Sequence, residues 1–445
     1  MALAPRPLPD SATVLASQTL HSPDLWGRLR RGFAVPPLTH ELVGSHARRF
    51  ASGGLINARA DRVRLYLPMI VEELEGRNMP LELALLPLVE SALNPQARSP
   101  VGALGLWQFM APTANRFELR TSRLVDDRKN LRQATRAAMD YLGKLHAQFG
   151  DWHLAMAAYN WGEGRVATAV ARNRARGLPT DFNALAAGMP AETRNYVPQI
   201  MALAALVANP AEFGYSLPAM PDGNPLSEVQ LTRDIDLSLA LRMAALSKRE
   251  FLALNPAIKP PLILAAATPR LLLPQDASTR LERALAAHTG KTASWTVHTL
   301  AATQPLETLA ARHGASVVAL REANGIPAGM KPVAGSTLLL PVAAAPGSQT
   351  HAQVVASAQL STTPDVVQVY TQARAKETPA DVARRSGVSL AQLAQWNGLA
   401  GKRLSQRLPA GKVLSLWVMR GREGGFLASA PVTKVVQAKP LRRPA

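Results

Sequence analysis

The sequence predicts a mainly α-helical domain followed by small α+β modules. Two observations support this prediction. Residues 24–215 carry apolar side chains at helical spacing with few strand signals, and from about residue 230 a pattern of Ser, an apolar residue and Asn recurs. The chain has 445 residues, enough for several domains, since one domain typically takes about 100–200 residues.

Proline and asparagine set the limits of the first helices. Residues 62–74 have helical spacing with an internal proline, and a second helix begins near residues 78–80 and ends before Asn94-Pro95. Proline is tolerated in the first turn of a helix and prevents its continuation. The second predicted helix therefore runs almost to Asn94.

Later helices in the domain have equally clear ends. Asn130 is a good N-cap for a third helix that ends at Gly150, and Asp151 caps a fourth that ends at residues 160–162. A long apolar helix is expected after residues 191–193. These signals together predict a helical domain.

Each copy of the repeat has Ser, an apolar residue four positions later and Asn four positions after that. Ser would cap a short helix, the apolar residue would face a core, and Asn would close the helix. Strand-like runs end every copy and begin the last two, which predicts strand–helix–helix–strand modules of roughly 45–50 residues. The copies are Ser247–Asn255, Ser316–Asn324 and Ser389–Asn397.

Composition shifts divide the chain further. Its start is rich in Pro, Ser and Ala, a later Ala-, Ser- and Thr-rich stretch resembles a linker, and its end is basic. The expected segments are a disordered start (1–23), the helical domain with its N-terminal extension (24–215), a degenerate module (230–275), a second module (293–342), a linker (343–364), a third module (365–419) and a basic tail (420–445).

The charge favours an acidic partner. The formal net charge is +19, and residues 361–445 hold 14 Lys or Arg against 4 Asp or Glu. Such an excess attracts nucleic acid, anionic lipid or an acidic cell-wall polymer, although it also serves solubility alone. The sequence contains no cysteine, which excludes disulfides, thiolate metal sites and a lipidated cysteine within it.

Several other classes of protein find no support. The sequence has no nucleotide-binding glycine pattern, no zinc-ligand spacing and no alternation of basic and aromatic residues, so no nucleic-acid partner is expected. Residues 1–20 lack the basic stretch and apolar run of a signal peptide. No apolar run is long enough to cross a membrane, and we expect no transmembrane segment.

Glu90 is the strongest candidate for catalysis. Cleaving a glycosidic bond needs an acid that stays neutral near neutral pH. Glu90 has apolar neighbours and lies near a predicted helix C-terminus, and both features raise the pKa of a carboxyl. A lone helix-end Glu is usually solvated, but four polar residues in ordered motifs weigh against that here: Ser91, Gln108, Tyr159 and Asn160.

Glycines and an amide follow Glu90 in a short loop. Gly102 and Gly105 would let the backbone approach a sugar closely. Gln108 would offer donors and an acceptor to an acetamido or hydroxyl group. Taken alone, this loop is more often a helix start with a capping Gln.

Two tyrosines and an asparagine come from later helices. Tyr159 could hydrogen-bond Glu90, and Asn160 could contact an N-acetyl group; the alternative is a helix cap with a core tyrosine. Tyr196 could belong to the core or to the site. The residue pattern leaves both assignments open.

A conventional glycosidase needs two carboxylates, about 5–5.5 Å apart when it retains configuration and about 6.5–9.5 Å apart when it inverts. No second carboxylate has surroundings as sheltered as those of Glu90, so a single-acid mechanism fits better. The candidates are Glu82, Asp126, Asp127 and Glu163.

These motifs resemble those of lytic murein transglycosylases with the goose-lysozyme-like fold, and specifically the membrane-bound D type. The repeats resemble LysM modules, which bind N-acetylglucosamine-containing glycans, and the first copy resembles a degenerate one. The resemblance covers residues 24–419 and rests on Glu90-Ser91, residues 105–108, residues 158–160, Tyr196, and residues 24–26 and 77–87.

The resemblance implies an enzyme that cuts the β-1,4 bond between N-acetylmuramic acid and N-acetylglucosamine without water, leaving a 1,6-anhydromuramic acid end. It implies peptidoglycan strands as partner, the periplasm or cell envelope as location, and no metal or cofactor. Glu90 would be the sole acid and base. The implied substrate-binding residues are Ser91, Gln108, Tyr159, Asn160 and Tyr196.

Three alternatives stay open at this point. A lysozyme-type hydrolase would use water in place of the sugar hydroxyl. A non-catalytic murein-binding scaffold would have no reason to keep a sheltered acid. A basic nucleic-acid binder would show salt-sensitive affinity.

Overall fold

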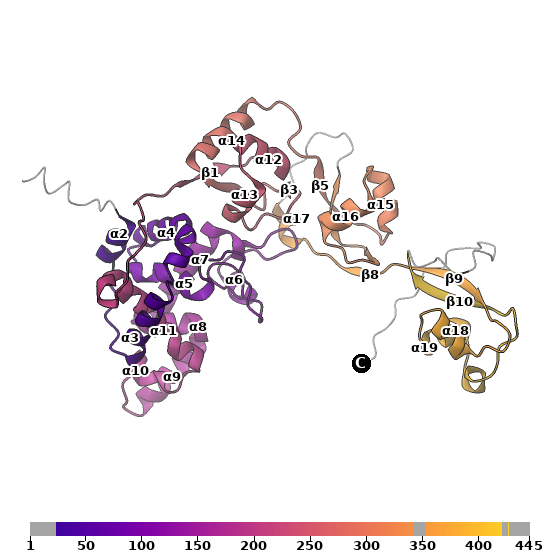
Figure 1. Cartoon of the computed structure of the whole chain (residues 1–445), viewed down its shortest axis with the longest axis horizontal. Helices are drawn as coiled ribbons and strands as arrows, with labels where there is room; N and C mark the ends of the chain where they lie inside the picture. Colours follow the sequence, from indigo (N-terminus) through magenta and orange to yellow (C-terminus); the bar gives the residue numbers. More distant parts are fainter. Residues whose placement is uncertain (1–23, 342–351, 421–425, 427–445) are drawn as a thin grey trace, which may run out of the picture. The chain divides into compact units, whose positions relative to one another are not determined.

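The protein is described by a computed structural model that covers residues 24–341, 352–420 and 426 (Figure 1). The predicted disordered start and nearly all of the predicted tail lie outside the described residues. The chain divides into two units. One comprises Met1–Thr296 with Ala344–Gln359, and the other Val297–Ala343 with Leu360–Ala445.

The first unit contains the predicted helical domain, drawn from indigo to magenta in Figure 1. Short 3-10 helices connect its α-helices: η1 (Asn57–Arg59), η2 (Leu81–Leu85), η3 (Asp127–Lys129) and η4 (Pro210–Phe213). The α-helices are α2 (Leu25–Arg31), α3 (Glu41–Ser52), α4 (Ala60–Glu75), α5 (Leu86–Ser91), α6 (Ala111–Arg116), α7 (Leu131–Phe149), α8 (Trp152–Trp161), α9 (Glu163–Ala175), α10 (Phe182–Ala186) and α11 (Ala191–Ala208).

The predicted caps of α7 and α8 are confirmed. The Asn130 side chain accepts a hydrogen bond from the Gln133 N–H at 3.1 Å, and that of Asp151 accepts one from the Leu154 N–H at 2.9 Å. Gly150 ends α7 in the left-handed region, with a φ of 68°. These caps fix where α8 starts, and therefore where its C-terminal Tyr159 lies.

The predicted helix from about residue 78 to residue 93 is divided in two. A 3-10 helix, η2, covers its first part and the short α5 its second. Pro87 has no N–H, so it cannot donate to the Leu83 carbonyl as an uninterrupted α-helix would require. The division leaves Glu90 one residue before the end of a six-residue helix.

The three modules have the predicted strand–helix–helix–strand order, and the first and last strand of each pair with one another. The first copy also begins with a strand, which the sequence analysis missed. The elements are β1 (Leu226–Gln230), α12 (Leu237–Ala244), α13 (Lys248–Leu254) and β4 (Arg270–Pro274); β5 (Trp295–Thr299), α15 (Leu306–His313), α16 (Val317–Asn324) and β7 (Thr337–Pro341); and β9 (Val366–Gln372), α18 (Pro379–Arg385), α19 (Leu390–Asn397) and β10 (Val413–Met419).

Shorter elements complete the modules. The first adds the antiparallel pair β2 (Ile235–Asp236) and β3 (Leu262–Ile263) and ends in α14 (Gln275–Ala287). The second adds β6 (Met330–Pro332), and η5 (Gly401–Leu404) lies in the third.

The repeated Asn joins the second helix of each module to its last strand. Asn324 Nδ2 donates to the carbonyls of Leu320 at 2.9 Å and Leu339 at 2.8 Å, while its Oδ1 accepts from the Leu339 N–H at 2.7 Å. Asn255 and Asn397 make the same three hydrogen bonds in their modules. We call this arrangement the Asn clamp.

Replacing Asn324 with Ala should destabilise the second module by about 2–4 kcal/mol, because two backbone groups of the buried Leu339 lose their partner. Hydrogen exchange at the Leu339 amide and thermal unfolding would measure the loss. Glu322→Ala, an exposed change in the same helix, is the control. Equal exchange rates in Asn324→Ala and the control would show that the clamp does not stabilise the module.

The described part of the predicted linker contains helix α17 (Ala352–Ser357) and strand β8 (Thr362–Pro364). The helix belongs to the first unit, where Ser122 Oγ donates to the Val355 carbonyl at 2.6 Å and the Arg123 N–H donates to the Ala358 carbonyl at 3.0 Å. Strand β8 pairs antiparallel with β6 in the second unit. This stretch is therefore structured on both sides of residue 360.

The first module is packed onto the helical domain within the first unit. Leu226, Leu254 and Leu272 of the module belong to the same apolar core as the helices. The Arg120 guanidinium donates to two consecutive carbonyls of the α13–β4 connection at 2.7 Å each, and the Tyr66 hydroxyl donates to the end of α13 at 3.0 Å. Across the described ranges, no helix has the length and apolar character that would let it span a membrane.

Candidate active site

The end of α5 places Glu90 beside α11. Ala92 and Leu93 both adopt left-handed backbone angles, with φ of 52° and 55°, and this turns the chain immediately after the helix. The Glu90 side chain is half-buried, and its Oε1 accepts a hydrogen bond of 2.5 Å from the Tyr196 hydroxyl. Tyr196 is itself only 5% exposed, so the pair lies at the edge of the core.

The surroundings of Glu90 bring the pKa of its carboxyl close to neutral pH. Burial is the largest influence and raises the pKa of the carboxyl, as its apolar neighbours predict. The Tyr196 hydrogen bond lowers that pKa and the charge of Glu192 raises it, and the outcome is a pKa of about 7. A group with this pKa can both donate and accept a proton near neutral pH.

The prediction that Tyr159 hydrogen-bonds Glu90 is wrong. The Tyr159 hydroxyl donates to the Trp107 carbonyl at 2.8 Å, and Tyr196 supplies the hydroxyl for Glu90. Trp107 is fully buried and its indole N–H donates to Thr135 of α7 at 3.0 Å. Tyr159 therefore supports the loop after α5, although it lies near enough to Glu90 to feel its charge.

Gln108 is held in the same loop with a strained backbone, since its φ is +48°. Its Nε2 donates to the carbonyls of Gly105 at 2.7 Å and Ala97 at 3.2 Å, and these bonds engage both N–H groups of the amide. The expected amide donors are thus used inside the loop. The Oε1 oxygen remains as the acceptor that the side chain can offer.

Ser91 joins the end of α5 to this loop. Its hydroxyl lies 2.9 Å from the Leu106 carbonyl and 3.2 Å from the Pro87 carbonyl, and it accepts from the Asn94 N–H at 3.2 Å. These contacts fix the separation between Glu90 and the loop.

A contact within the protein requires glycine at Gly105. Its φ is +86°, and a Cβ at this position would lie 2.0 Å from the Arg128 carbonyl oxygen. The close approach is to protein backbone. Arg128 also binds the loop through its side chain, donating to the Gly102 carbonyl at 3.1 Å while Asp126 pairs with it at 2.8 Å.

Glu192 also lies beside these residues, and the sequence analysis missed it. Asn160 Nδ2 lies 3.4 Å from Glu192 Oε1, and Asn160 Oδ1 accepts from the Thr193 hydroxyl at 2.7 Å. The available signal was spacing, because Glu192 precedes Tyr196 by four residues in α11 and so shares its helical face. Glu192 is exposed, whereas Glu90 is sheltered.

The four carboxylates weighed as a second catalytic acid are all engaged elsewhere. Glu82 accepts from the backbone N–H groups that follow α2, and the others each pair with an arginine. The pairs are Asp126 with Arg128 at 2.8 Å, Asp127 with Arg120 at 2.7 Å, and Glu163 with Arg116 at 2.8 Å.

Comparison with known proteins places this site in a family. Residues 68–180 match the transglycosylase SLT domain, and residues 306–341 and 374–417 match the LysM domain. The membrane-bound lytic murein transglycosylase D of Escherichia coli K12 is 31% identical over 348 residues, which are 76% of this chain and 74% of that protein. The chain belongs to the membrane-bound lytic murein transglycosylase D family.

Other lytic transglycosylases match a shorter part. The soluble lytic murein transglycosylase of Escherichia coli K12 is 35% identical over 28% of this chain and 20% of its own length. The solved Escherichia coli Slt70 structure covers 44% of this chain and 31% of its own, at 24% identity and a TM-score of 0.30. In this member of the transglycosylase D family, the segment that matches the SLT domain contains Glu90, Gln108 and Tyr159.

Replacing Tyr196 with Phe should extend activity to higher pH. The Tyr196 hydroxyl favours the ionised carboxyl, so its loss raises the pKa of Glu90 above about 7 and keeps the acid form to higher pH. The alkaline limb of kcat/KM against pH on solubilised murein glycan would show the shift. Tyr141→Phe, which removes a hydroxyl from α7, is the control, and an unmoved limb in Tyr196→Phe would contradict the assignment.

Proposed function

We propose that this chain is a lytic murein transglycosylase that cleaves the β-1,4 bond between N-acetylmuramic acid and N-acetylglucosamine and leaves a 1,6-anhydromuramic acid end. The observation that carries the proposal is the half-buried Glu90, with a pKa of about 7, bound to the hydroxyl of Tyr196. Family membership supports the same reaction.

The reaction would use one carboxyl twice. Glu90 protonates the glycosidic oxygen as the bond from that oxygen to the muramyl C1 breaks, and the substrate's acetamido group stabilises the cationic centre. The ionised Glu90 then takes the proton of the muramyl C6 hydroxyl, whose oxygen bonds to C1. The Tyr196 hydroxyl stabilises the carboxylate between these steps.

The remaining residues would hold the sugar and the acid. Gln108 offers its Oε1 to an N–H or hydroxyl of the glycan, and Asn160 lies beside Glu192 where it can meet an N-acetyl group. Ser91 and Tyr159 act through the loop that carries Gln108. This mechanism needs no metal or cofactor.

The LysM modules would hold the enzyme on peptidoglycan strands in the cell envelope through N-acetylglucosamine-containing glycan. Deleting residues 366–445, which removes the third module and leaves α17 and β8 in place, should weaken retention on murein sacculi several-fold while cleavage of soluble fragments continues. Pelleting assays with and without these residues measure this. Equal pelleting would contradict the role given to the module.

Mass spectrometry of the soluble products from purified murein tests the reaction itself. Products lighter by one water than reducing muropeptides are expected. Reducing ends would mean a lysozyme-type hydrolase and would direct attention to Glu192 as the second carboxylate. Pelleting with sacculi and no release would favour the non-catalytic scaffold.

A further inference from the structure

A cavity separate from Glu90 lies where the first module meets the helical domain. Its volume is about 290 Å³, close to the lower end of the range for small-ligand sites. The first turns of α7 form one wall, and the end of α13 with the β4 strand and the chain before it forms the other. Both walls belong to the first unit.

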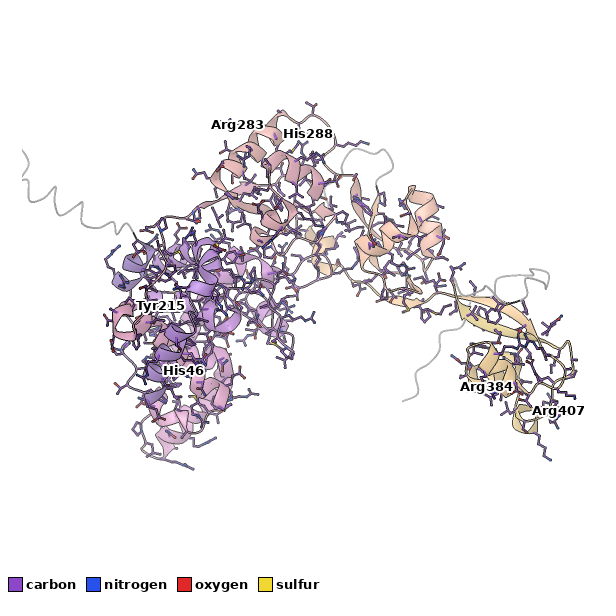
Figure 2. All side chains as sticks on the ribbon, viewed as in Figure 1. His46, Tyr215, Arg283, His288, Arg384 and Arg407 are labelled. Carbon is purple, nitrogen blue, oxygen red and sulfur yellow. The ribbon has the colours of Figure 1, made fainter. Side chains whose placement is uncertain are left out.

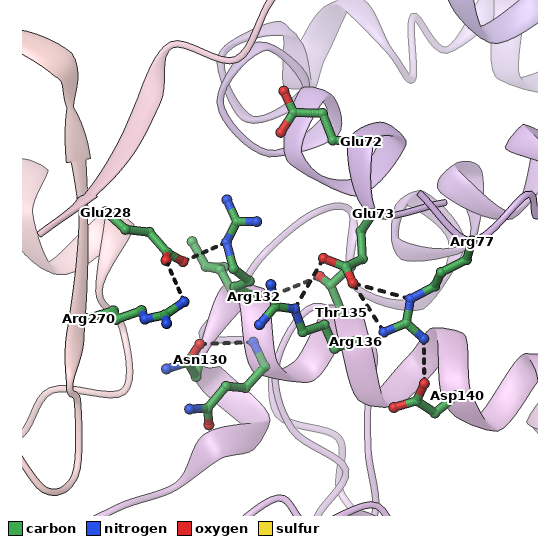
Figure 3. A network of polar contacts seen from close by, with 12 residues as sticks. Glu72, Glu73, Arg77, Asn130, Arg132, Thr135, Arg136, Asp140, Glu228 and Arg270 are labelled. Carbon is green, nitrogen blue, oxygen red and sulfur yellow. Dashed lines mark hydrogen bonds and ion pairs between the residues drawn. The ribbon is translucent and has the colours of Figure 1, made fainter. Parts of the chain in front are cut away.

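Three guanidinium groups line this cavity against one carboxylate. Arg132 and Arg136 come from α7, and Arg270 and Glu228 from the module (Figure 3). Glu228 already binds two of the cations, at 2.7 Å from Arg132 and 3.1 Å from Arg270. The lining side chains therefore carry two more positive than negative charges, and Glu73, which lies outside the lining, offsets one of them by pairing with Arg136.

Arg132 and Arg136 keep unused donors. Among the described residues, each makes one polar side-chain contact, through Nε, to Glu228 at 2.7 Å and to Glu73 at 3.2 Å. Within that part of the chain, the terminal nitrogens of the two guanidinium groups donate no hydrogen bond. Two parallel N–H groups of a guanidinium match the two oxygens of a carboxylate.

The rest of the lining has an apolar part beside four polar side chains, which are Asn130, Gln133, Asn255 and Thr268. Leu254, Leu272 and Pro256 contribute from the module together with Ala257 and Pro269. An inorganic anion gains nothing from such a wall, whereas a short peptide with methyl side chains does.

We propose that this cavity binds the free carboxyl end of a short peptide with small apolar side chains, the class to which the peptide stems of murein belong. Arg132 and Arg136 hold the carboxylate and the apolar wall takes the methyl groups. Naming murein as the source rests on the proposed function; the peptide-carboxylate chemistry does not. The site would read the peptide while Glu90 acts on the glycan.

Titration of the full chain with N-acetyl-D-alanyl-D-alanine, followed by calorimetry or NMR, tests the proposal. Replacing the dipeptide by its C-terminal amide should weaken binding about 10-fold or more, because the charge-assisted hydrogen bonds are lost. Inorganic phosphate should also bind about 10-fold more weakly, since it cannot use the apolar wall. The ligand comparison uses the unaltered protein, so it does not depend on a variant that folds.

The double variant Arg132→Gln, Arg136→Gln should weaken dipeptide binding at least about 10-fold. Arg283→Gln removes an exposed arginine from α14 of the same module, labelled in Figure 2, and should leave binding unchanged. Equal binding of acid and amide, equal binding of phosphate, or unchanged affinity in the double variant would each overturn the proposal.

The assay separates this site from the reaction at Glu90. Glu90→Gln should bind the dipeptide as the unaltered chain does, because Glu90 does not line the cavity. Loss of murein cleavage with intact dipeptide binding would count only against the proposed function, and intact cleavage without dipeptide binding only against this site.

Discussion

Glu90→Gln should lower the release of anhydro-muropeptides from murein at least about 1,000-fold, because a single side chain serves as both acid and base. The glutamine amide keeps the volume of the carboxyl and can still accept the Tyr196 hydrogen bond, so the fold should persist. Product release measured by mass spectrometry, with circular dichroism on the same sample, gives the result.

Glu82→Gln is the matched control, since it alters a buried carboxyl of the adjoining η2 that binds backbone N–H groups of residues 34 and 35. It should reduce stability while retaining most of the specific activity of the folded protein. Substantial activity in a folded Glu90→Gln variant would refute the catalytic assignment.

Glu90→Gln should also change how the free energy of unfolding depends on pH. The folded protein raises the pKa of Glu90 from 4.5 to about 7, so the stability associated with this group is fully present below the unfolded pKa and is lost as pH rises through about 7. Glu90→Gln removes that loss. Between pH 4 and pH 9, the free energy of unfolding of Glu90→Gln should therefore rise by up to about 3 kcal/mol relative to that of the unaltered chain.

Gly105→Ala should be the most destabilising single change in the loop, costing about 3 kcal/mol or more. An alanine would have to hold a φ of +86°, and its Cβ would lie 2.0 Å from the backbone oxygen of Arg128. Since backbone cannot move aside as a side chain can, the loop bearing Gln108 would shift. The free energy of unfolding, measured by chemical denaturation, and the specific activity should both fall.

Gly143→Ala is the control for this prediction. Gly143 lies inside α7, and a Cβ added there would meet no atom within 4 Å, so the added methyl should stabilise the protein by about 0.5–1 kcal/mol. A Gly105→Ala variant as stable and as active as Gly143→Ala would show that the contact with Arg128 is unimportant.

Local chemistry explains what the sequence could predict. The caps at Asn130 and Asp151 depend on neighbouring residues, and so does the helix-closing position of each repeated Asn. Glu90 was identified from its apolar neighbours for the same reason. Its raised pKa follows mainly from burial, which those neighbours already imply.

Contacts between distant segments of the chain explain what the sequence could not predict. Whether Tyr159 or Tyr196 reaches Glu90 depends on how α8 and α11 pack against α5, and spacing along the chain does not give this. The approach of Arg128 to Gly105 and the packing of the first module on the helices are likewise tertiary. The missed strand β1 begins before the repeat pattern does.

The Asn clamp contacts only main-chain atoms of the last strand, so the clamp itself places no demand on which side chains that strand carries. Outside the two segments that match the LysM domain, the first module keeps the clamp while its α13–β4 connection attaches to the helical domain. The same internal framework therefore serves both a module that matches the LysM domain and one whose connecting segment is attached to the helical domain.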